Sequence, residues 1–187
     1  MSKAIWDHRL LVVIGKGGVG RTTMAASLGI AAAKDGKRVC LVEMSGLSDL
    51  SRAFGYAEPS YAPRQVRPGL DLRSISANDC LDDFGKRKLR LGRLSRRFMR
   101  SRVLGAFLDA VPGLHDLLQL GKVENAMNEP LQHETQYDLT ILDAPATGHG
   151  LSMLAAARTM RRMARVGPFA DLARIIEVWL SDTDQTA

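Results

Sequence analysis

The residues best suited to chemistry in this chain lie in one glycine-rich run, "GKGGVGRTT", at positions 15–23. Glycine has no Cβ and tolerates positive φ, so consecutive backbone N–H groups in such a run can converge on one anion. A helix that begins at the end of the run adds its positive dipole end. Gly15, Gly20 and Thr22 match the spacing of the GxxxxGKT/S pattern that binds nucleotide phosphates. The run therefore predicts a triphosphate site with Thr22 on magnesium.

One position departs from this pattern, because Arg21 stands where the pattern has lysine. Lysine places a compact charge between the β- and γ-phosphates, where negative charge redistributes during phosphoryl transfer. A guanidinium keeps the charge but is larger, planar and forked, so it can still hold phosphate. A misplacement of about 1 Å can cost about 10²-fold in rate. We therefore expect a loop that binds nucleotide and hydrolyses it slowly.

A second acidic position follows the apolar segment "YDLTILDAP" at 137–145. Asp143 ends this predicted strand, and open α/β sheets bind their ligands at the carboxyl ends of their strands. A carboxylate there can hold a magnesium-bound water opposite Thr22. The glycine-bearing "APATGHG" that follows is suited to a loop that moves with the γ-phosphate. The alternative is that Asp143 caps the next helix.

The elements that must position these residues alternate along the chain. Apolar runs predict buried strands. Between the first two predicted strands lies a segment of small helix formers, which stops at a predicted helix cap, Asp35-Gly36. This alternation predicts an open, mostly parallel α/β sheet covered by helices, the architecture of P-loop NTPases. The predicted strands are 10–14, 38–43, 70–75 and 137–145, and the first helix is 22–34.

The rest of the chain reads as helical. Residues 79–129 form a predicted helical insertion that leans out from the sheet, with breaks at Gly105 and Pro112-Gly113. Two further helices are expected at about 150–165 and 169–181. We assign 1–187 to a single nucleotide-binding domain. Because no strand is predicted after the last helix, either the sheet is small or the domain is incomplete at its C-terminus.

Composition narrows the choice of partners. The chain has a net charge of +6, and nine basic residues without an acid lie between 86 and 102. This stretch can be a solvated helix face, or it can dock an acidic partner or lipid; DNA is the least favoured, since no aromatic platform accompanies it. No apolar segment approaches the length of a transmembrane helix. Two cysteines far apart give no disulfide framework, so we expect a cytoplasmic protein.

Taken together, these motifs resemble the ArsA-type anion-transporting ATPases, deviant Walker A proteins related to the ATPase that targets tail-anchored membrane proteins. "GKGGVGRTT" is similar to the family's GKGGVGKTT, and "DAPATGH" (143–149) to its DTAPTGH. "LSD" (47–49) and "PGLHDLLQLGKV" (112–123), which resembles PG-x-x-(D/E)-x-L, complete the match. The resemblance is strongest to the bacterial branch and runs from residue 10 to about 150.

The resemblance implies a role for each matching residue. ATP and Mg²⁺ would be the cofactors, although the family's adenine contacts lie beyond position 187. Lys16 would reach across a dimer to the phosphates of the other subunit, unless it is simply a solvated loop residue. Asp143 would sense the γ-phosphate and order the second switch loop through Gly148 and His149. The implied phosphate-binding residues are Gly15, Lys16, Gly17, Gly18, Val19, Gly20, Arg21, Thr22 and Thr23, with Thr22 and Asp143 as the magnesium ligands.

The family's water-activating aspartate lies in a first switch that resembles DPAHxLSD. This chain has the shorter "EMSGLSD" at 43–49. Asp49 is the candidate, with Glu43 as a possible substitute, and Asp49 could instead cap the helix at 50–54. Among the methionines after the second switch (Met153, Met160 and Met163), core packing is favoured over a client-binding surface. His149 is expected to structure its loop rather than act as a base.

Three functional hypotheses follow. The first is a slow dimeric ATPase that couples nucleotide binding to an unidentified protein client. The second is a catalytically silent subunit that completes a heterodimer with an active sibling. The third is a partitioning or division ATPase that acts on DNA or membrane through residues 86–102.

Overall fold

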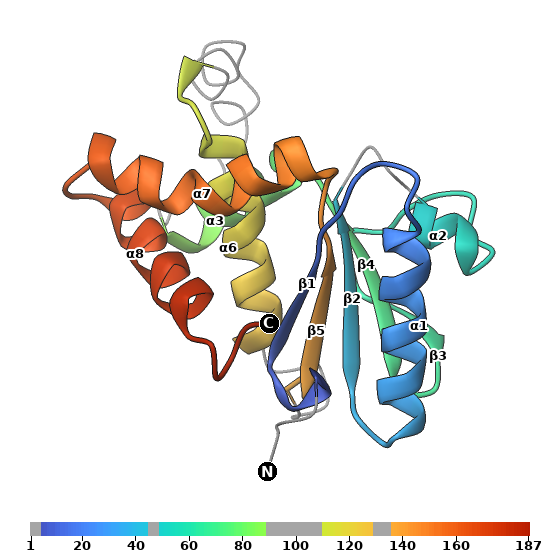
Figure 1. Cartoon of the computed structure of the whole chain (residues 1–187). Helices are drawn as coiled ribbons and strands as arrows, with labels where there is room; N and C mark the ends of the chain where they lie inside the picture. The colour runs from blue at the N-terminus through green and yellow to red at the C-terminus, as the bar shows by residue number, and fades with distance from the viewer. Residues whose placement is uncertain (1–4, 45–48, 89–109, 129–135) are drawn as a thin grey trace.

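The computed structural model describes residues 5–44, 49–88, 110–128 and 136–187. Its centre is a five-stranded sheet in the order β1-β5-β2-β4-β3 (Figure 1). The first four strands in this order run parallel, and β3 pairs antiparallel with β4 at the edge. The predicted parallel α/β sheet is therefore confirmed. The strands are β1 (Leu10–Val13), β2 (Val39–Met44), β3 (Arg64–Arg67), β4 (Leu70–Ile75) and β5 (Leu139–Asp143).

The central strands consist of apolar runs because helices cover both of their faces. Every residue of β2 and β5 is buried. The register aligns Val13 of β1 and Glu43 of β2 with Asp143 of β5, so three strands end at the same edge. β3 was missed: it is a short edge strand between prolines, and only Val66 of its four residues is buried. Such a strand carries no apolar periodicity for a sequence to display.

Helices form a layer on each side of the sheet (Figure 1). On one side, α1 packs with α2 against residues of β1, β2 and β5. On the other, α3, α6, α7 and α8 build the larger part of the core. A short 3-10 helix (Ile5–Asp7) precedes β1. The helices are α1 (Arg21–Lys34), α2 (Asp49–Ala53), α3 (Ala77–Lys88), α6 (Leu114–Asn128), α7 (Thr147–Met163) and α8 (Pro168–Ser181).

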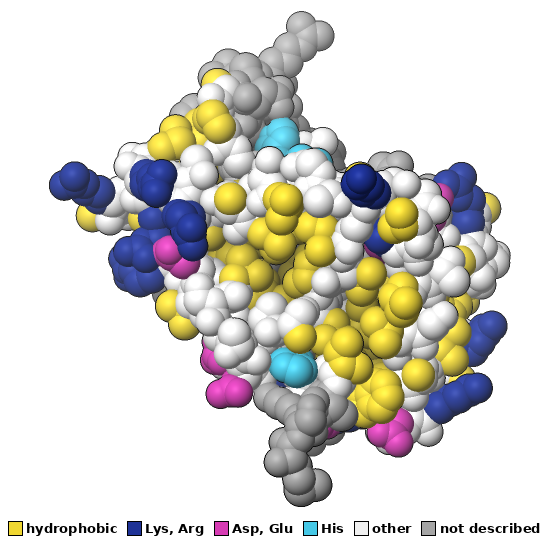
Figure 2. Space-filling model, in the orientation of Figure 1, with side chains coloured by type: hydrophobic (Ala, Val, Ile, Leu, Met, Phe, Trp, Pro, Cys, Tyr) yellow, Lys and Arg dark blue, Asp and Glu magenta, His cyan; other side chains and the backbone are white. Residues whose placement is uncertain are grey.

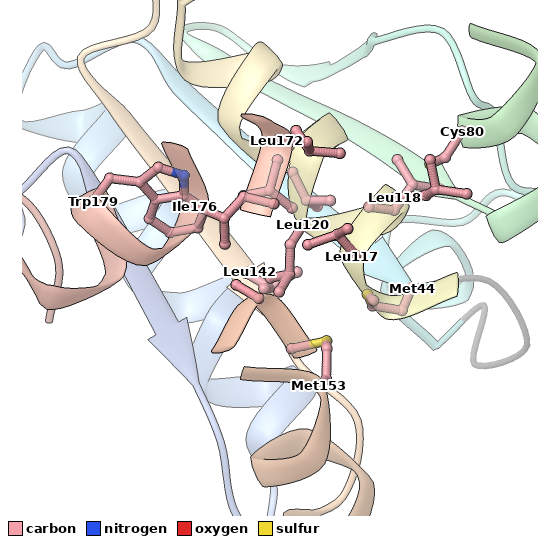
Figure 3. Packing of buried hydrophobic residues seen from close by; sticks show 14 of the residues in the cluster. Met44, Cys80, Leu117, Leu118, Leu120, Leu142, Met153, Leu172, Ile176 and Trp179 are labelled. Atoms are coloured by element: carbon pink, nitrogen blue, oxygen red, sulfur yellow. The ribbon is translucent and has the colours of Figure 1, made fainter. Parts of the chain in front are cut away.

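In the larger core, buried side chains from several elements pack around α6, as Figure 3 shows. Leu117 and Leu120 of α6 are fully buried, and they share the cluster with Met153 of α7 and Ile176 of α8. Met160 is buried there as well. The expected core role of Met153 and Met160 is confirmed. For Met163 it is wrong, because this residue ends α7 and is 56% exposed.

The helical insertion is described only in part. α3 and α6 are helices within the predicted range 79–129, although α3 begins two residues early at Ala77. The predicted break at Pro112-Gly113 is confirmed, since Gly113 has φ 75° and α6 begins at Leu114. The predicted break at Gly105 and residues 89–102 of the basic stretch lie outside the described residues.

The sheet edge at β1 carries a pairing that the sequence did not predict. The N–H of Leu10 donates to the carbonyl of Gln185 at 2.9 Å, and the N–H of Ala187 donates to the carbonyl of Leu10 at 3.1 Å. The bridge between Leu10 and Thr186 is parallel. This pairing is an isolated bridge, and among the described residues no strand follows α8, as the sequence predicted. The bridge itself was not predicted, because the polar tail 182–187 shows no apolar pattern. Within the described part of the chain, no helix is long and apolar enough to cross a bilayer.

Candidate nucleotide-binding site

The glycine-rich loop lies between the end of β1 and the start of α1, as the sequence predicted. Gly18 and Gly20 have φ of 79° and 88°, in the left-handed region that other residues rarely adopt. A Cβ built on Gly17, Gly18 or Gly20 would meet no atom within 4 Å. The concave side of the loop is therefore open at the positions where backbone N–H groups can approach an anion.

Gly15 is needed for a different reason. A Cβ at this position would lie 3.2 Å from Cγ2 of Val19 and 3.3 Å from Cγ of Arg21. The loop therefore folds closely over the aliphatic stem of its own arginine. Lys16, Val19 and Thr23 are exposed, with Val19 64% exposed at the crest of the loop. These exposed side chains leave a partner molecule access to the loop.

Asp143 and Thr22 meet at the base of the loop. The Asp143 side chain is 1% exposed, and its Oδ2 accepts a hydrogen bond of 2.7 Å from Oγ1 of Thr22. Its Oδ1 is buried and has no hydrogen-bond partner among the described residues. Burial raises the pKa of this carboxyl, while Thr22 and Arg21 act in the opposite direction. A buried carboxylate oxygen without a hydrogen bond calls for an explanation, and a bound ligand is one.

Arg21 turns toward the end of β5. Its Nη1 donates to the carbonyl of Ala144 and lies 3.9 Å from Oδ1 of Asp143. The side chain is only 12% exposed, so the guanidinium lies between the loop and the strand end. Arg21, which replaces the lysine of the pattern, therefore links the phosphate loop to the residue that follows β5.

The start of α2 is held by Glu43, and the sequence did not predict this structural role. Glu43 is the second-last residue of β2 and is fully buried, and its Oε2 accepts from the backbone N–H of Leu50 at 3.0 Å and of Ser51 at 3.2 Å. Its Oε1 accepts from Oγ of Ser51. Glu43 thus satisfies N–H groups at the start of α2. A buried acid at a strand end, a few residues before a short helix, was the signal available.

Asp49 occupies a different environment. It is the first residue of α2, its side chain is 52% exposed, and it pairs with Arg52. Residues 45–48, which include most of the "LSD" motif, lie outside the described residues. The structure therefore brings Thr22, Arg21 and Asp143 into contact, and it leaves Asp49 on the surface.

The second switch connects the loop to α6. The N–H of Thr147 donates to the carbonyl of Gly15 at 3.0 Å, and α7 begins at Thr147. Nε2 of His149 lies 3.3 Å from Oδ1 of Asp116 in α6. Burial raises the pKa of Asp116, while His149 and His115 lower it. Asp116 was missed as a site residue, although it is the acid of the segment 112–123.

The donor set fits Mg²⁺ and a triphosphate. A hydroxyl and a carboxylate oxygen are hard ligands, and magnesium sites of this kind complete their shell with water and phosphate oxygens. The described residues contain no group of three or more His, Cys, Asp or Glu placed to hold a metal by themselves. Few protein ligands beside an open glycine loop suit a metal that arrives with the nucleotide.

A mostly parallel sheet with this loop and a carboxylate on the adjacent strand defines a P-loop NTPase. The model of the ArsA family, described as anion-transporting ATPase, matches residues 8–179. The chain belongs to this family.

Curated relatives agree with this assignment. The chain is 28% identical to ATPase BagA of Mycobacterium tuberculosis over 166 residues, which are 86% of this chain and 49% of that protein. It is 27% identical to ATPase GET3 of Komagataella phaffii over 169 residues, again 86% and 49%. It is 30% identical to ATPase ASNA1 homolog 1 of Paramecium tetraurelia over 156 residues, 81% and 44%. The chain thus spans about half the length of the curated relatives it matches.

Proposed function

We propose that this chain is the nucleotide-binding part of a dimeric Mg-ATP switch that hydrolyses ATP slowly and couples nucleotide binding to a protein partner. The observation that carries the proposal is the contact of Arg21 with Ala144 and Asp143 at the base of an open phosphate loop. Membership of an ATPase family supports ATP as the nucleotide.

Each residue of the site has a role in this proposal. Backbone N–H groups of 15–22 would hold the phosphates, and Thr22 and Asp143 would hold Mg²⁺, Asp143 through water. When bound, Mg²⁺ would supply positive charge that stabilises the negative charge of the phosphates. Asp49 positions the attacking water, for which the exposed start of α2 leaves room. The phosphate-contacting set remains Gly15, Lys16, Gly17, Gly18, Val19, Gly20, Arg21, Thr22 and Thr23.

Slow hydrolysis follows from what Arg21 must give up. To contact a phosphate fully, the guanidinium has to exchange its bond with Ala144 and its proximity to Asp143 for the anion. Its planar fork also presents two N–H directions where the family's lysine presents one compact charge. Binding tolerates this difference, whereas the transition state depends on exact placement of charge.

The switch reaches a partner through α6. His149 follows the second-switch glycine and pairs with Asp116, which belongs to the helical side of the molecule. If the nucleotide displaced the segment that contains His149, the contact with Asp116 would transmit the displacement to α6. This contact supports coupling to a partner that docks on the helical side.

The test is single-turnover hydrolysis of Mg-ATP by the wild type and by Arg21→Lys. We expect the variant to be faster by about tenfold or more, because lysine restores the compact charge, while nucleotide affinity changes less. Arg67→Lys, an exposed arginine on β3 away from the loop, is the matched control and should leave the rate unchanged. Equal rates for wild type and Arg21→Lys would contradict the attenuation.

The second candidate is a silent subunit that binds nucleotide and completes a heterodimer with an active ATPase. The exposed Lys16 beside an inward-turned Arg21 favours it, since such a subunit would lend its lysine to the sibling's phosphates. Its signature is nucleotide binding with no measurable hydrolysis at any protein concentration. A wild-type rate that rises with protein concentration as dimers form would exclude it.

A further inference from the structure

A basic and apolar surface lies at the turn from α7 into α8, far from the phosphate loop. We call residues Arg162, Met163, Arg165 and Val166 the arginine tip. Figure 2 shows Lys and Arg side chains gathered at the left end of the molecule, where Figure 1 places the end of α7 and the turn into α8. The turn contains Gly167 at φ 100° and Pro168, which begins α8.

The charge of the arginine tip is not neutralised by its surroundings. Neighbouring arginines are paired: Arg161 bonds to Glu177, and Arg174 lies 3.5 Å from Asp171. Arg162 and Arg165 are exposed, and within the described part of the chain neither has an acidic partner. Two exposed guanidinium groups therefore lie within four residues of each other at the end of α7 and the start of the turn.

Two exposed apolar side chains belong to the same segment as these arginines. Val166 is 86% exposed and Met163 is 56% exposed. Arginines at the end of a helix are explained by its dipole, which favours cations there. The dipole gives no reason for Met163 and Val166 to face solvent. Met163 and Val166 are thus exposed apolar residues in the same segment as the two arginines, and the dipole accounts only for the arginines.

We propose that the arginine tip binds the surface of a bilayer that contains anionic phospholipids. Guanidinium groups bind lipid phosphates bidentately, and valine and methionine side chains enter the boundary between headgroups and acyl chains. The tip projects as a turn rather than as a groove, and a fluid lipid surface can close around a projecting turn from all sides. This surface is separate from the nucleotide site and acts whether or not ATP is hydrolysed.

The experiment is co-sedimentation of the whole chain with vesicles of phosphatidylcholine alone or mixed with phosphatidylglycerol. We expect binding to the mixed vesicles only, weakened by salt. Arg162→Glu with Arg165→Glu should lower the partition coefficient by about tenfold or more, and Val166→Asp should also lower it. The basic stretch 86–102 is intact in every variant, so a loss reports on the tip.

Two controls separate the tip from net charge and from folding. Lys34→Glu with Arg67→Glu changes the net charge equally at exposed positions on α1 and β3, and it should retain binding. Arg162→Lys with Arg165→Lys should also retain most binding, and thermal unfolding checks that each variant is folded. Binding that is independent of anionic lipid, or that survives the Glu and Asp substitutions, would overturn the proposal. Binding of polyglutamate without binding to vesicles would also overturn it, in favour of an acidic protein partner.

Discussion

Asp143 combines deep burial with an oxygen atom that the described part of the fold leaves without a hydrogen bond. Its side chain is 1% exposed, yet Oδ1 has no hydrogen-bond partner among the described residues. A buried carboxylate with an unsatisfied oxygen destabilises the folded state, and burial accordingly raises its pKa. Thr22 and Arg21 compensate for part of this cost. A metal bound at Oδ1 through water would compensate for the rest.

At this scale we predict that Asp143→Asn raises the melting temperature by about 3 °C near pH 7, since about 1 kcal/mol of buried charge is removed. The folded pKa is raised, so the ionised carboxyl destabilises the wild type above that pKa. The difference between the two proteins should therefore shrink as pH falls through that pKa toward the ordinary carboxyl range. Calorimetry without nucleotide measures this, and Mg²⁺-dependent nucleotide affinity should be lost in the variant.

Asp138→Asn is the matched control, because Arg38 lowers the pKa of Asp138. The charge of Asp138 stabilises the fold above its unfolded pKa, and this contribution is lost as pH falls through the lowered folded pKa. The control should therefore melt at or below the wild-type temperature near pH 7. A stabilisation of equal size in both variants would show that the effect is not specific to the site.

At the scale of elements, β2 and α2 are joined by one side chain. The buried carboxylate of Glu43 accepts three hydrogen bonds from the start of α2, two from backbone N–H groups and one from a hydroxyl. α2 has only five residues, too few to be stable without such contacts. The position of Asp49 at its first residue therefore depends on Glu43.

We predict that Glu43→Ala lowers the free energy of unfolding by about 2–4 kcal/mol, because buried donors lose their acceptor. Glu43→Gln keeps an acceptor oxygen and should lose less. Urea unfolding followed by circular dichroism measures both variants. Glu58→Ala, at an exposed position, is the control and should remain within about 0.5 kcal/mol of the wild type. A loss for Glu43→Ala no larger than that of the control would contradict the anchoring role.

At the scale of the whole molecule, the candidate site lies on the surface, and residues 16–20 of its glycine-rich loop are exposed. Lys16 and Val19 are exposed there, and the second switch connects the loop to α6 through His149 and Asp116. A nucleotide between two such crests would therefore contact both subunits, while its effect on the second switch would reach the helical side. Assembly and partner coupling would then depend on the same bound nucleotide.

The prediction at this scale concerns assembly. Lys16→Ala should reduce Mg-ATP-dependent dimerisation by about tenfold or more, because a phosphate contact across the interface is lost. Nucleotide affinity at low protein concentration should change little, since in the proposed dimer Lys16 would contact the other subunit's phosphates. Sedimentation velocity with and without nucleotide measures the first quantity and fluorescence titration the second. Lys34→Ala is the control. Unchanged dimerisation of Lys16→Ala would show that Lys16 makes no phosphate contact across the interface.

Much of the site was predictable because it is local in sequence. The loop from Gly15 to Thr22 is contiguous, and its glycines are dictated by the backbone conformation that phosphate binding needs. The strand before it and the helix after it follow from apolar runs and small residues. The position of Asp143 beside the loop was predictable for a related reason, because it ends a buried apolar strand and parallel strands of an open sheet end at the same edge.

The amino-acid sequence by itself determined the class of fold, the phosphate loop and the carboxylate opposite it, since each depends on contacts within a few residues or on a repeated apolar pattern. Tertiary structure alone decided that Arg21 bonds to Ala144, that Glu43 holds α2, that Asp116 pairs with His149 and that β3 and the tail pair at the sheet edges. These contacts join segments through side-chain geometry or edge hydrogen bonds, and neither leaves a periodic pattern along the chain.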